Sequence, residues 1–139
     1  MKLVVDASVA AKWLLAETDS EKAQALFRAW TAKRVTLLAP ELLPAEIASA
    51  LWKRVMRGFL PGPEALKLQR EFNDLKIPLH PIEGLVDAAF DLALRFRCSV
   101  YDGLYLALAS ATDADLVTAD EKLFGLAAAG STLLLREWQ

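Results

Sequence analysis

Four acidic residues, spread along the chain, could together hold a divalent metal ion: Asp6, Glu46, Asp102 and Asp120. Clustered carboxylates repel one another unless a cation offsets their charge. Oxygen ligands suit Mg²⁺ or Mn²⁺ rather than zinc, and Mg²⁺ keeps several waters, so some of the acids would act through water. Such an ion lowers the pKa of a bound water and offsets charge that builds on a phosphate. These residue types therefore suit metal-assisted attack of water on a phosphate.

Each acid taken alone also has an ordinary structural interpretation. Asp6 and Asp120 lie at, or two residues past, the end of an apolar strand and just before a helix, where aspartate commonly serves as the helix cap. Glu46 falls on the polar face of an amphipathic helix, where a solvated glutamate is common. Asp102 opens an almost wholly apolar helix, and it could cap that helix or point into a cleft. Only the four residues together favour a metal site.

The pattern of apolar residues predicts the elements that must bring these acids together. Strands are predicted at 3–5, 35–38, 115–118 and 132–135, and the segment 77–82, with two prolines, is predicted to be an edge strand or irregular. Helices are predicted at 7–15, from a cap at Asp19 onward, and at 41–57, 64–75, 83–96, 103–111 and 121–129.

Strands that alternate with helices predict an α/β fold. We expect one domain over residues 1–139, a three-layer sandwich whose mostly parallel central sheet is covered by helices on both faces. Ligands of such sheets bind beyond the carboxyl ends of the strands. Asp6 and Asp120 are expected at that edge.

Composition limits the class of protein. The chain has 139 residues, 55% of them hydrophobic and 24% charged, which is enough to build a core. A formal net charge of -2 is not the basic signature of a general nucleic-acid binder, so any such affinity must be local. Cys98, the single cysteine, excludes an internal disulfide, and no apolar run approaches the ~20 residues of a membrane span. We expect a cytoplasmic protein that does not enter a membrane.

Several basic residues could follow a nucleic-acid backbone. Lys53 and Arg57 share the helical face of Glu46, and Lys12 follows Asp6 by two turns, so these three are the best candidates for phosphate contacts. Arg54 belongs to the same basic run. Three further cations are interpreted as solvated surface: Arg28, Lys33 and Arg34.

Other residues that could carry chemistry are interpreted structurally. Trp13, Trp30 and Trp52 fall on apolar stripes and are expected in the core or in a dimer contact rather than stacked on bases. The only histidine, His80, lies between an apolar residue and a proline and is expected to be structural. Its solitary occurrence excludes a site built from several histidines.

Four segments of the chain, in order, resemble the PIN-domain nucleases, and most of all the VapC-type toxins of prokaryotic toxin–antitoxin pairs. The segments are Val4–Ser8 with Lys12–Leu14, Pro40–Leu51, Val100–Ala109 and Leu116–Leu123. One such segment would be a weak signal, whereas four in the family's order span nearly the whole chain and are specific.

The resemblance implies a Mg²⁺- or Mn²⁺-dependent endoribonuclease. It also implies a homodimer and a small antitoxin whose C-terminal segment enters the active cleft, often with an arginine. The residues that match the family's acidic site are Asp6, Glu46, Asp102 and Asp120, and those that match its hydroxyl positions are Ser8 and Thr118. Ser49 stands where the family often has asparagine, which leaves the acids intact but removes an amide that could support them.

Two other classes remain open at this point. A PIN-like module could bind RNA or protein without cutting, although the presence of all four acids argues against it. An aspartyl-phosphate phosphatase also has an aspartate after its first strand, but it needs a second aspartate two residues later, where this chain has Ser8.

Overall fold

A computed structural model of the chain describes residues 1–126 and 132–139. Its sheet has five parallel strands in the order β3-β2-β1-β4-β5. They are β1 (Lys2–Val5), β2 (Thr36–Pro40), β3 (Leu79–His80), β4 (Asp115–Thr118) and β5 (Thr132–Leu134). β1 lies at the centre, with Val4 opposite Leu38 of β2 and Leu116 of β4.

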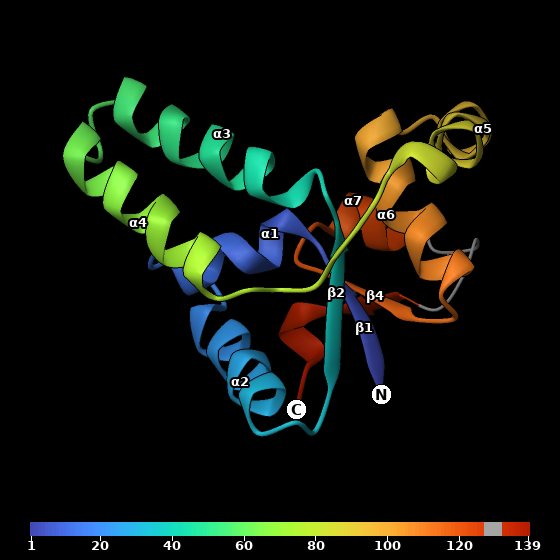
Figure 1. Cartoon of the computed structure of the whole chain (residues 1–139), viewed down its shortest axis with the longest axis horizontal. Coiled ribbons are helices and arrows are strands. Elements are labelled where there is room, and N and C mark those ends of the chain that lie inside the picture. The colour runs from blue at the N-terminus through green and yellow to red at the C-terminus, as the bar shows by residue number, and fades with distance from the viewer. Residues whose placement is uncertain (127–131) are drawn as a thin grey trace.

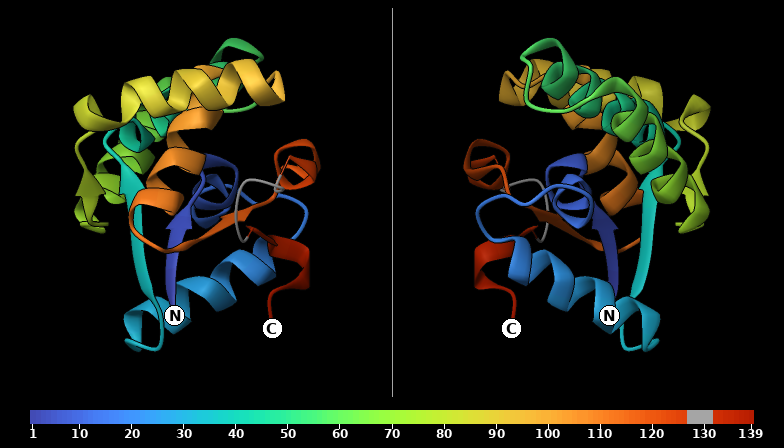
Figure 2. Two further views of the ribbon diagram at one scale, coloured as in Figure 1. Left: turned by 90° about the vertical axis from the view of Figure 1, so that its right-hand side faces the viewer. Right: turned by 90° about the vertical axis from the view of Figure 1, so that its left-hand side faces the viewer.

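Helices cover both faces of the sheet, as the alternating pattern predicts (Figure 1, Figure 2). On one face lie α1 (Ala7–Ala10), α2 (Ser20–Thr31), α3 (Leu43–Met56) and α4 (Gly62–Asp74), and on the other α5 (Val86–Phe96), α6 (Val100–Ala111) and α7 (Glu121–Gly125). Short 3₁₀ turns occupy Ala11–Trp13, Glu83–Leu85 and Leu135–Glu137. The three-layer α/β sandwich is therefore confirmed.

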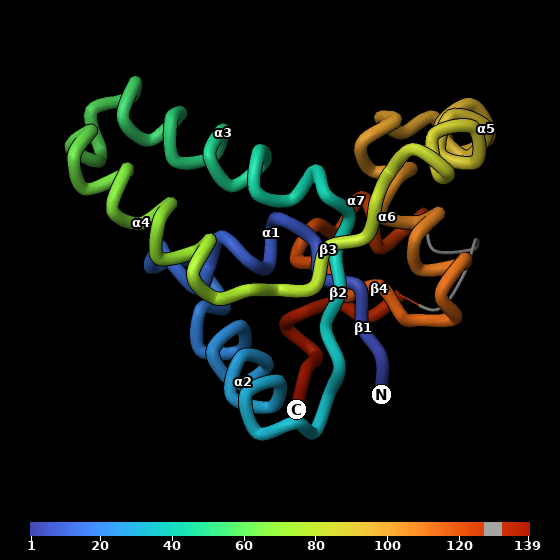
Figure 3. The backbone as a smooth tube through the Cα atoms, in the orientation of Figure 1, coloured from blue at the N-terminus to red at the C-terminus, as the bar shows by residue number. Residues whose placement is uncertain are grey.

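Strand alternation divides the core into two clusters. Leu3 and Val5 of β1 pack beneath α1 to α4, whereas Val4 packs with Leu116 beneath α5 and α6. Residues 103–109 of α6 are all buried, as expected for a helix that is apolar nearly all round. Two long helices, α3 and α4, extend from the sheet as a hairpin, which the tube trace in Figure 3 shows clearly.

Several boundaries differ from the sequence predictions. The predicted helix 41–57 begins at Leu43, and the predicted helix 7–15 divides into α1 and a 3₁₀ turn. Asp19 does not cap α2 with its side chain, because its backbone is left-handed (φ 64°) and no such hydrogen bond forms. Of the predicted helix 121–129, Glu121–Gly125 is helical, and residues 127–129 lie outside the described part of the chain.

The three tryptophans do not share one environment. Trp13 and Trp30 are half-buried and pack against the first core cluster, as predicted. Trp52 is 59% exposed on α3, so it does not lie in the core, and the alternative of a dimer contact stays a prediction. Within the described residues, no helix is both long and apolar enough to cross a membrane.

Candidate active site

Asp6 and Asp120 lie at the same edge of the sheet. Asp6 directly follows β1, Asp120 lies two residues after β4, and these strands are parallel neighbours. Both also cap helices: Asp6 accepts a hydrogen bond from the backbone N–H of Ser8, and Asp120 accepts from Lys122 and Leu123. The cap interpretation is correct for both, and it coexists with a position at the carboxyl ends of the strands.

Two hydroxyl groups hold Asp6 in place. Thr118 donates from Oγ1 to Asp6 Oδ2 over 2.6 Å, and Ser8 donates from Oγ to the same oxygen over 3.0 Å. Each hydroxyl also accepts from a backbone N–H, Thr118 from Asp120 and Ser8 from Ala119, both at 3.0 Å. The network ties the end of β1 to the end of β4, so both predicted hydroxyl residues support the acidic edge.

Glu46 and Asp102 reach this edge from opposite faces of the sheet. Glu46 lies in the first turn of α3, where Tyr105 of α6 donates from Oη to its Oε1 over 2.7 Å. Asp102 lies in the first turn of α6, but the cap of that helix is Ser99, whose Oγ accepts the Asp102 N–H. The cap interpretation of Asp102 is therefore wrong, and its half-buried carboxylate is left to the site.

Three of the four acids have a pKa that is raised by burial and by neighbouring acids. Burial raises the pKa of Asp6 against the effect of its hydroxyl partners, and the charge of Asp120 raises it further. Burial also raises the pKa of Glu46, with added contributions from Asp6 and Asp102. The pKa of Asp102 is raised by burial and by the charges of Asp6 and Asp120. Among the described residues, none of these acids lies within 4.0 Å of a basic nitrogen.

This donor set fits a hard divalent cation. Neighbouring carboxylates raise the pKa values of Asp6, Glu46 and Asp102, and a cation bound between the acids would remove this repulsion. No group of three or more acidic, histidine or cysteine side chains in residues 1–126 and 132–139 forms a ready cage for a metal ion. The arrangement therefore suits Mg²⁺ or Mn²⁺ held by one or two carboxylates and by waters that the other acids contact.

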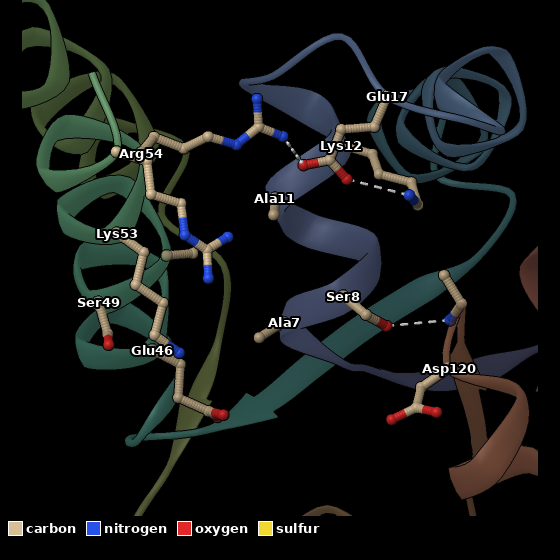
Figure 4. Close-up of a pocket in the computed structure, with 13 residues that line it drawn as sticks. Ala7, Ser8, Ala11, Lys12, Glu17, Glu46, Ser49, Lys53, Arg54 and Asp120 are labelled. Carbon is tan, nitrogen blue, oxygen red and sulfur yellow. Dashed lines mark hydrogen bonds and ion pairs between the residues drawn. The ribbon is translucent and has the colours of Figure 1, made fainter. Parts of the chain in front are cut away.

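A cleft of about 470 Å³ adjoins the acids (Figure 4). Glu46 and Asp120 lie at one end of it, and Arg54 of α3 and Lys12 of the 3₁₀ turn after α1 lie toward the other. Its lining comprises Ala7, Ser8, Ala11, Lys12, Glu17, Glu46, Ser49, Ala50, Lys53, Arg54, Arg57, Ala119 and Asp120. An RNA backbone could thus lie along basic residues while one phosphate meets the acids.

The structure sorts the predicted basic residues into two groups. Lys12, Lys53 and Arg57 line the cleft, as does Ser49. The three cations interpreted as solvated surface are exposed on α2 and in the turn before β2, outside the cleft lining: Arg28, Lys33 and Arg34. His80 contributes to the edge strand β3, and its Nδ1 donates to the carbonyl oxygen of Pro81 over 2.8 Å.

Three residues of the site escaped the sequence prediction. Tyr105 has a usable signal in the sequence, because a tyrosine in an apolar, buried stretch of helix needs a partner for its hydroxyl. Arg54 was grouped with its basic neighbours but not preferred, although it lines the cleft. Glu17 carries no local sequence signal, since the folded chain alone brings it between Lys12 and Arg54.

Comparison with known proteins finds the same family over most of the chain. Residues 3–129 match the family model described as PIN domain. Ribonuclease VapC3 of Pyrobaculum aerophilum is 38% identical over 127 residues, 88% of this chain and 92% of the relative. The structure resembles that of Mycobacterium tuberculosis VapC20, described as a sarcin-ricin loop cleaving toxin (TM-score 0.70, 16% identity, 93% of this chain and 95% of that one). It also resembles VapBC2 of Rickettsia felis bound to a promoter DNA fragment (TM-score 0.65, 15% identity, 96% and 98%).

Proposed function

The chain belongs to the PIN-domain family, and from that premise we propose that it is a metal-dependent endoribonuclease, the toxin of a VapBC-type toxin–antitoxin pair. The observation that carries the proposal is the convergence of four carboxylates from β1, α3, α6 and the turn after β4 beside a cleft lined by cations. A relative that is 38% identical and named a ribonuclease supports RNA as the substrate.

Asp6, Glu46, Asp102 and Asp120 would hold Mg²⁺ or Mn²⁺, which when bound lowers the pKa of water and offsets charge on the phosphate. Lys53 and Arg57 bind phosphates of the RNA and orient the backbone along α3. Water attacks phosphorus in line with the departing 3′ oxygen, and its proton passes to the carboxylate cluster. The P–O3′ bond breaks, the 3′ oxygen takes up a proton, and the products carry a 5′-phosphate and a 3′-hydroxyl.

The experiment that tests this proposal is cleavage of a structured RNA by the purified protein with Mg²⁺ or Mn²⁺, beside EDTA. Asp102→Asn removes one carboxylate charge at a half-buried position, and we expect cleavage to fall about 1,000-fold, since charge stabilisation by such a site is worth several kcal/mol. Asp91→Asn is the matched control, because Asp91 is an exposed aspartate on α5 paired with Arg95. It should cut RNA like the unaltered protein.

Two outcomes would contradict the proposal. Full, metal-dependent activity in both Asp102→Asn and Asp6→Asn would place the site elsewhere. A folded, partner-free protein that binds Mg²⁺ or Mn²⁺ but cuts none of several RNAs would favour the second candidate, a PIN-like module that binds without cutting.

We further propose a small antitoxin as partner, in the cytoplasm where RNA is present. The α3–α4 hairpin exposes a run of large apolar side chains, Trp52, Met56, Phe59 and Leu66, beside an apolar groove of about 460 Å³. Because α3 also carries the cleft residues, a segment packed on this hairpin can continue into the cleft, where an arginine would meet the unpaired carboxylates. Co-expression with a short neighbouring reading frame should yield a complex that no longer cuts RNA.

A homodimer is proposed as well. Val86, Phe90 and Leu94 are exposed at i, i+4 and i+8 along α5 and form an apolar stripe. Helix α5 lies on the side of the molecule away from the α3–α4 hairpin (Figure 1). Light scattering on the purified protein should give twice the mass of the chain. A monomer at micromolar concentration would contradict this part of the proposal.

A further inference from the structure

One anion inside the cleft is shared by two cations. Glu17, in the segment between the 3₁₀ turn and α2, places Oε1 2.7 Å from Arg54 Nη2 and Oε2 3.1 Å from Lys12 Nζ. Figure 4 shows the three side chains meeting at the end of the cleft away from Asp120. Each carboxylate oxygen thus serves a different cation, and the cations come from different walls of the cleft.

The walls that carry these cations also carry the acidic site. Ser8 and Lys12 are four residues apart on one wall and both face the cleft. Glu46, Ser49, Lys53 and Arg57 recur along α3 at helical spacing on the other wall, and Arg54 lies beside them. A polyanion that leaves the acids along the cleft therefore reaches the point where Lys12 and Arg54 converge.

The Glu17 carboxylate, which lies between Lys12 and Arg54, makes the contacts that a phosphate would make there. Two oxygens of one anion, each held by a separate charge-assisted hydrogen bond, are what Lys and Arg offer to a phosphodiester. The side chains of Lys12, Glu17 and Arg54 are 11%, 26% and 36% exposed, so the anion is accessible from the cleft while both cations are partly withdrawn from solvent. Because Glu17 and Arg54 are both partly exposed, the ion pair between them is weak enough for another anion to displace the carboxylate.

We propose that Lys12 and Arg54 form a phosphate subsite for the RNA strand next to the cleaved bond, and that Glu17 fills this subsite in the free protein. RNA must displace the Glu17 carboxylate to bind fully, so Glu17 lowers the affinity of the cleft for RNA. The inference rests on the proposed ribonuclease function and adds to it a competitor for substrate that is part of the chain itself.

The test measures binding of a fluorescent single-stranded RNA in EDTA, so that no cleavage intervenes. Glu17→Gln keeps the length of the side chain and removes the charge, and we expect the Kd to fall about threefold to fivefold, the combined strength of its two partly exposed ion pairs. Lys12→Met and Arg54→Met should each raise the Kd and reduce the salt dependence by about 0.7 in log Kd per log salt, as for one lost phosphate contact. Asp91→Asn makes the same charge change outside the cleft and should leave the Kd unchanged.

A combined variant distinguishes competition at the subsite from a general repulsion between the Glu17 charge and RNA. With Lys12→Met and Arg54→Met already present, Glu17→Gln should give no gain in affinity, because Glu17 acts through these two cations. A gain that persists in that background would overturn the inference. So would weaker binding by Glu17→Gln alone, which would show that Glu17 positions the cations rather than competing for them.

Cleavage measured in parallel keeps the two proposals apart. If the unaltered protein cuts RNA with Mg²⁺ but Glu17→Gln binds RNA no better than Asp91→Asn, only this inference fails. If the unaltered protein neither binds nor cuts RNA, the proposed function fails. Thermal unfolding of each variant establishes that it is folded, and the two cation variants provide the test if Glu17→Gln is not.

Discussion

Asp6 and Asp102 belong to the same acidic site, but the protein positions them by different means. Asp6 is 7% exposed and accepts from Thr118 and Ser8, so a polar network fixes it to the sheet edge. Among the described residues, the hydroxyl that acts on the Asp102 carboxylate is that of Ser99, the cap of the same helix, and it does not tie Asp102 to the sheet edge as Thr118 and Ser8 tie Asp6. The position of Asp102 depends on that of helix α6. The residue after it, Gly103, packs directly against the backbone of Ala89 in α5.

The two aspartates therefore represent two halves of the site. The fold itself fixes Asp6 and Asp120, whereas Glu46 and Asp102 have fewer contacts and depend more on a bound ligand for their positions. Asp6 and Asp120 are tied into the backbone of two neighbouring strands, so their separation is part of the fold. Among the described residues, the Glu46 carboxylate has a single hydrogen-bond partner, Tyr105, and Asp102 follows the position of its helix. Variants that attack each means of support should therefore give different effects.

The largest expected effect comes from adding a side-chain atom where α5 and α6 pack most closely. A Cβ on Gly103 would lie 2.4 Å from the carbonyl oxygen of Ala89, so Gly103→Ala must push the helices apart. We expect the free energy of unfolding to fall by about 3 kcal/mol, as for severe overpacking, and RNA cleavage to fall because Asp102 moves with α6. Urea unfolding measures the first quantity and initial cleavage rates the second.

A second helical glycine provides the control for this variant. Gly62, at the start of α4, has open space where a Cβ would lie, so Gly62→Ala should leave cleavage unchanged and not destabilise the protein. Equal stability of Gly103→Ala and Gly62→Ala would show that helix packing does not position Asp102.

The residues show which parts of this arrangement sequence alone can predict. Asp6 and Asp120 follow from a simple rule, since parallel strands that precede helices end at one edge of the sheet. Glu46 does not, because helical periodicity cannot distinguish a solvated glutamate from one that faces a cleft. The Glu17–Arg54 ion pair joins residues 37 positions apart, and no local pattern records such a contact. The predicted cap at Asp19 does not form, because the backbone there is left-handed, and the cap that remained one alternative for Asp102 is provided by Ser99.

The second-largest expected effect tests the hydrogen bonds that hold Asp6 at the sheet edge. Thr118→Val removes the buried 2.6 Å hydrogen bond to Asp6 and the acceptor for the Asp120 N–H, which is part-buried. We expect a loss of about 2 kcal/mol in stability and a 10- to 100-fold loss of cleavage, as when a group that supports a metal ligand is removed. Thr118→Ser keeps the hydroxyl and should retain most activity. Thr36→Val makes the same change at an exposed strand position and should have little effect on either quantity.

A smaller effect is expected at Tyr105, which donates a hydrogen bond to the Glu46 carboxylate. Tyr105→Phe removes the 2.7 Å bond and leaves the ring in the core, so the loss in stability should be about 1 kcal/mol. Half-buried Glu46 can turn to solvent, so we expect only a several-fold loss of cleavage, much less than for Thr118→Val. A larger loss of RNA cleavage in Tyr105→Phe than in Thr118→Val would contradict this comparison. It would show that the position of Glu46 is fixed more tightly by hydrogen bonds than that of Asp6.

The smallest effect is a dependence of stability on pH without metal. Burial first, and then neighbouring carboxylates, raise the pKa values of Asp6, Glu46 and Asp102 above the ordinary 3.8 for Asp and 4.5 for Glu. An acid whose pKa is higher in the folded state binds its proton more tightly there, so its contribution to stability is lost as pH rises through the folded pKa and regained as pH falls toward the ordinary value. In EDTA the melting temperature should therefore rise, relative to Asp6→Asn, as pH falls from neutral toward those ordinary values. Saturating Mg²⁺ should reduce this gain, because the cation stabilises the ionised carboxylates that protonation otherwise removes. Identical pH profiles for the two proteins would mean that Asp6 is not strained by its burial and by its acidic neighbours.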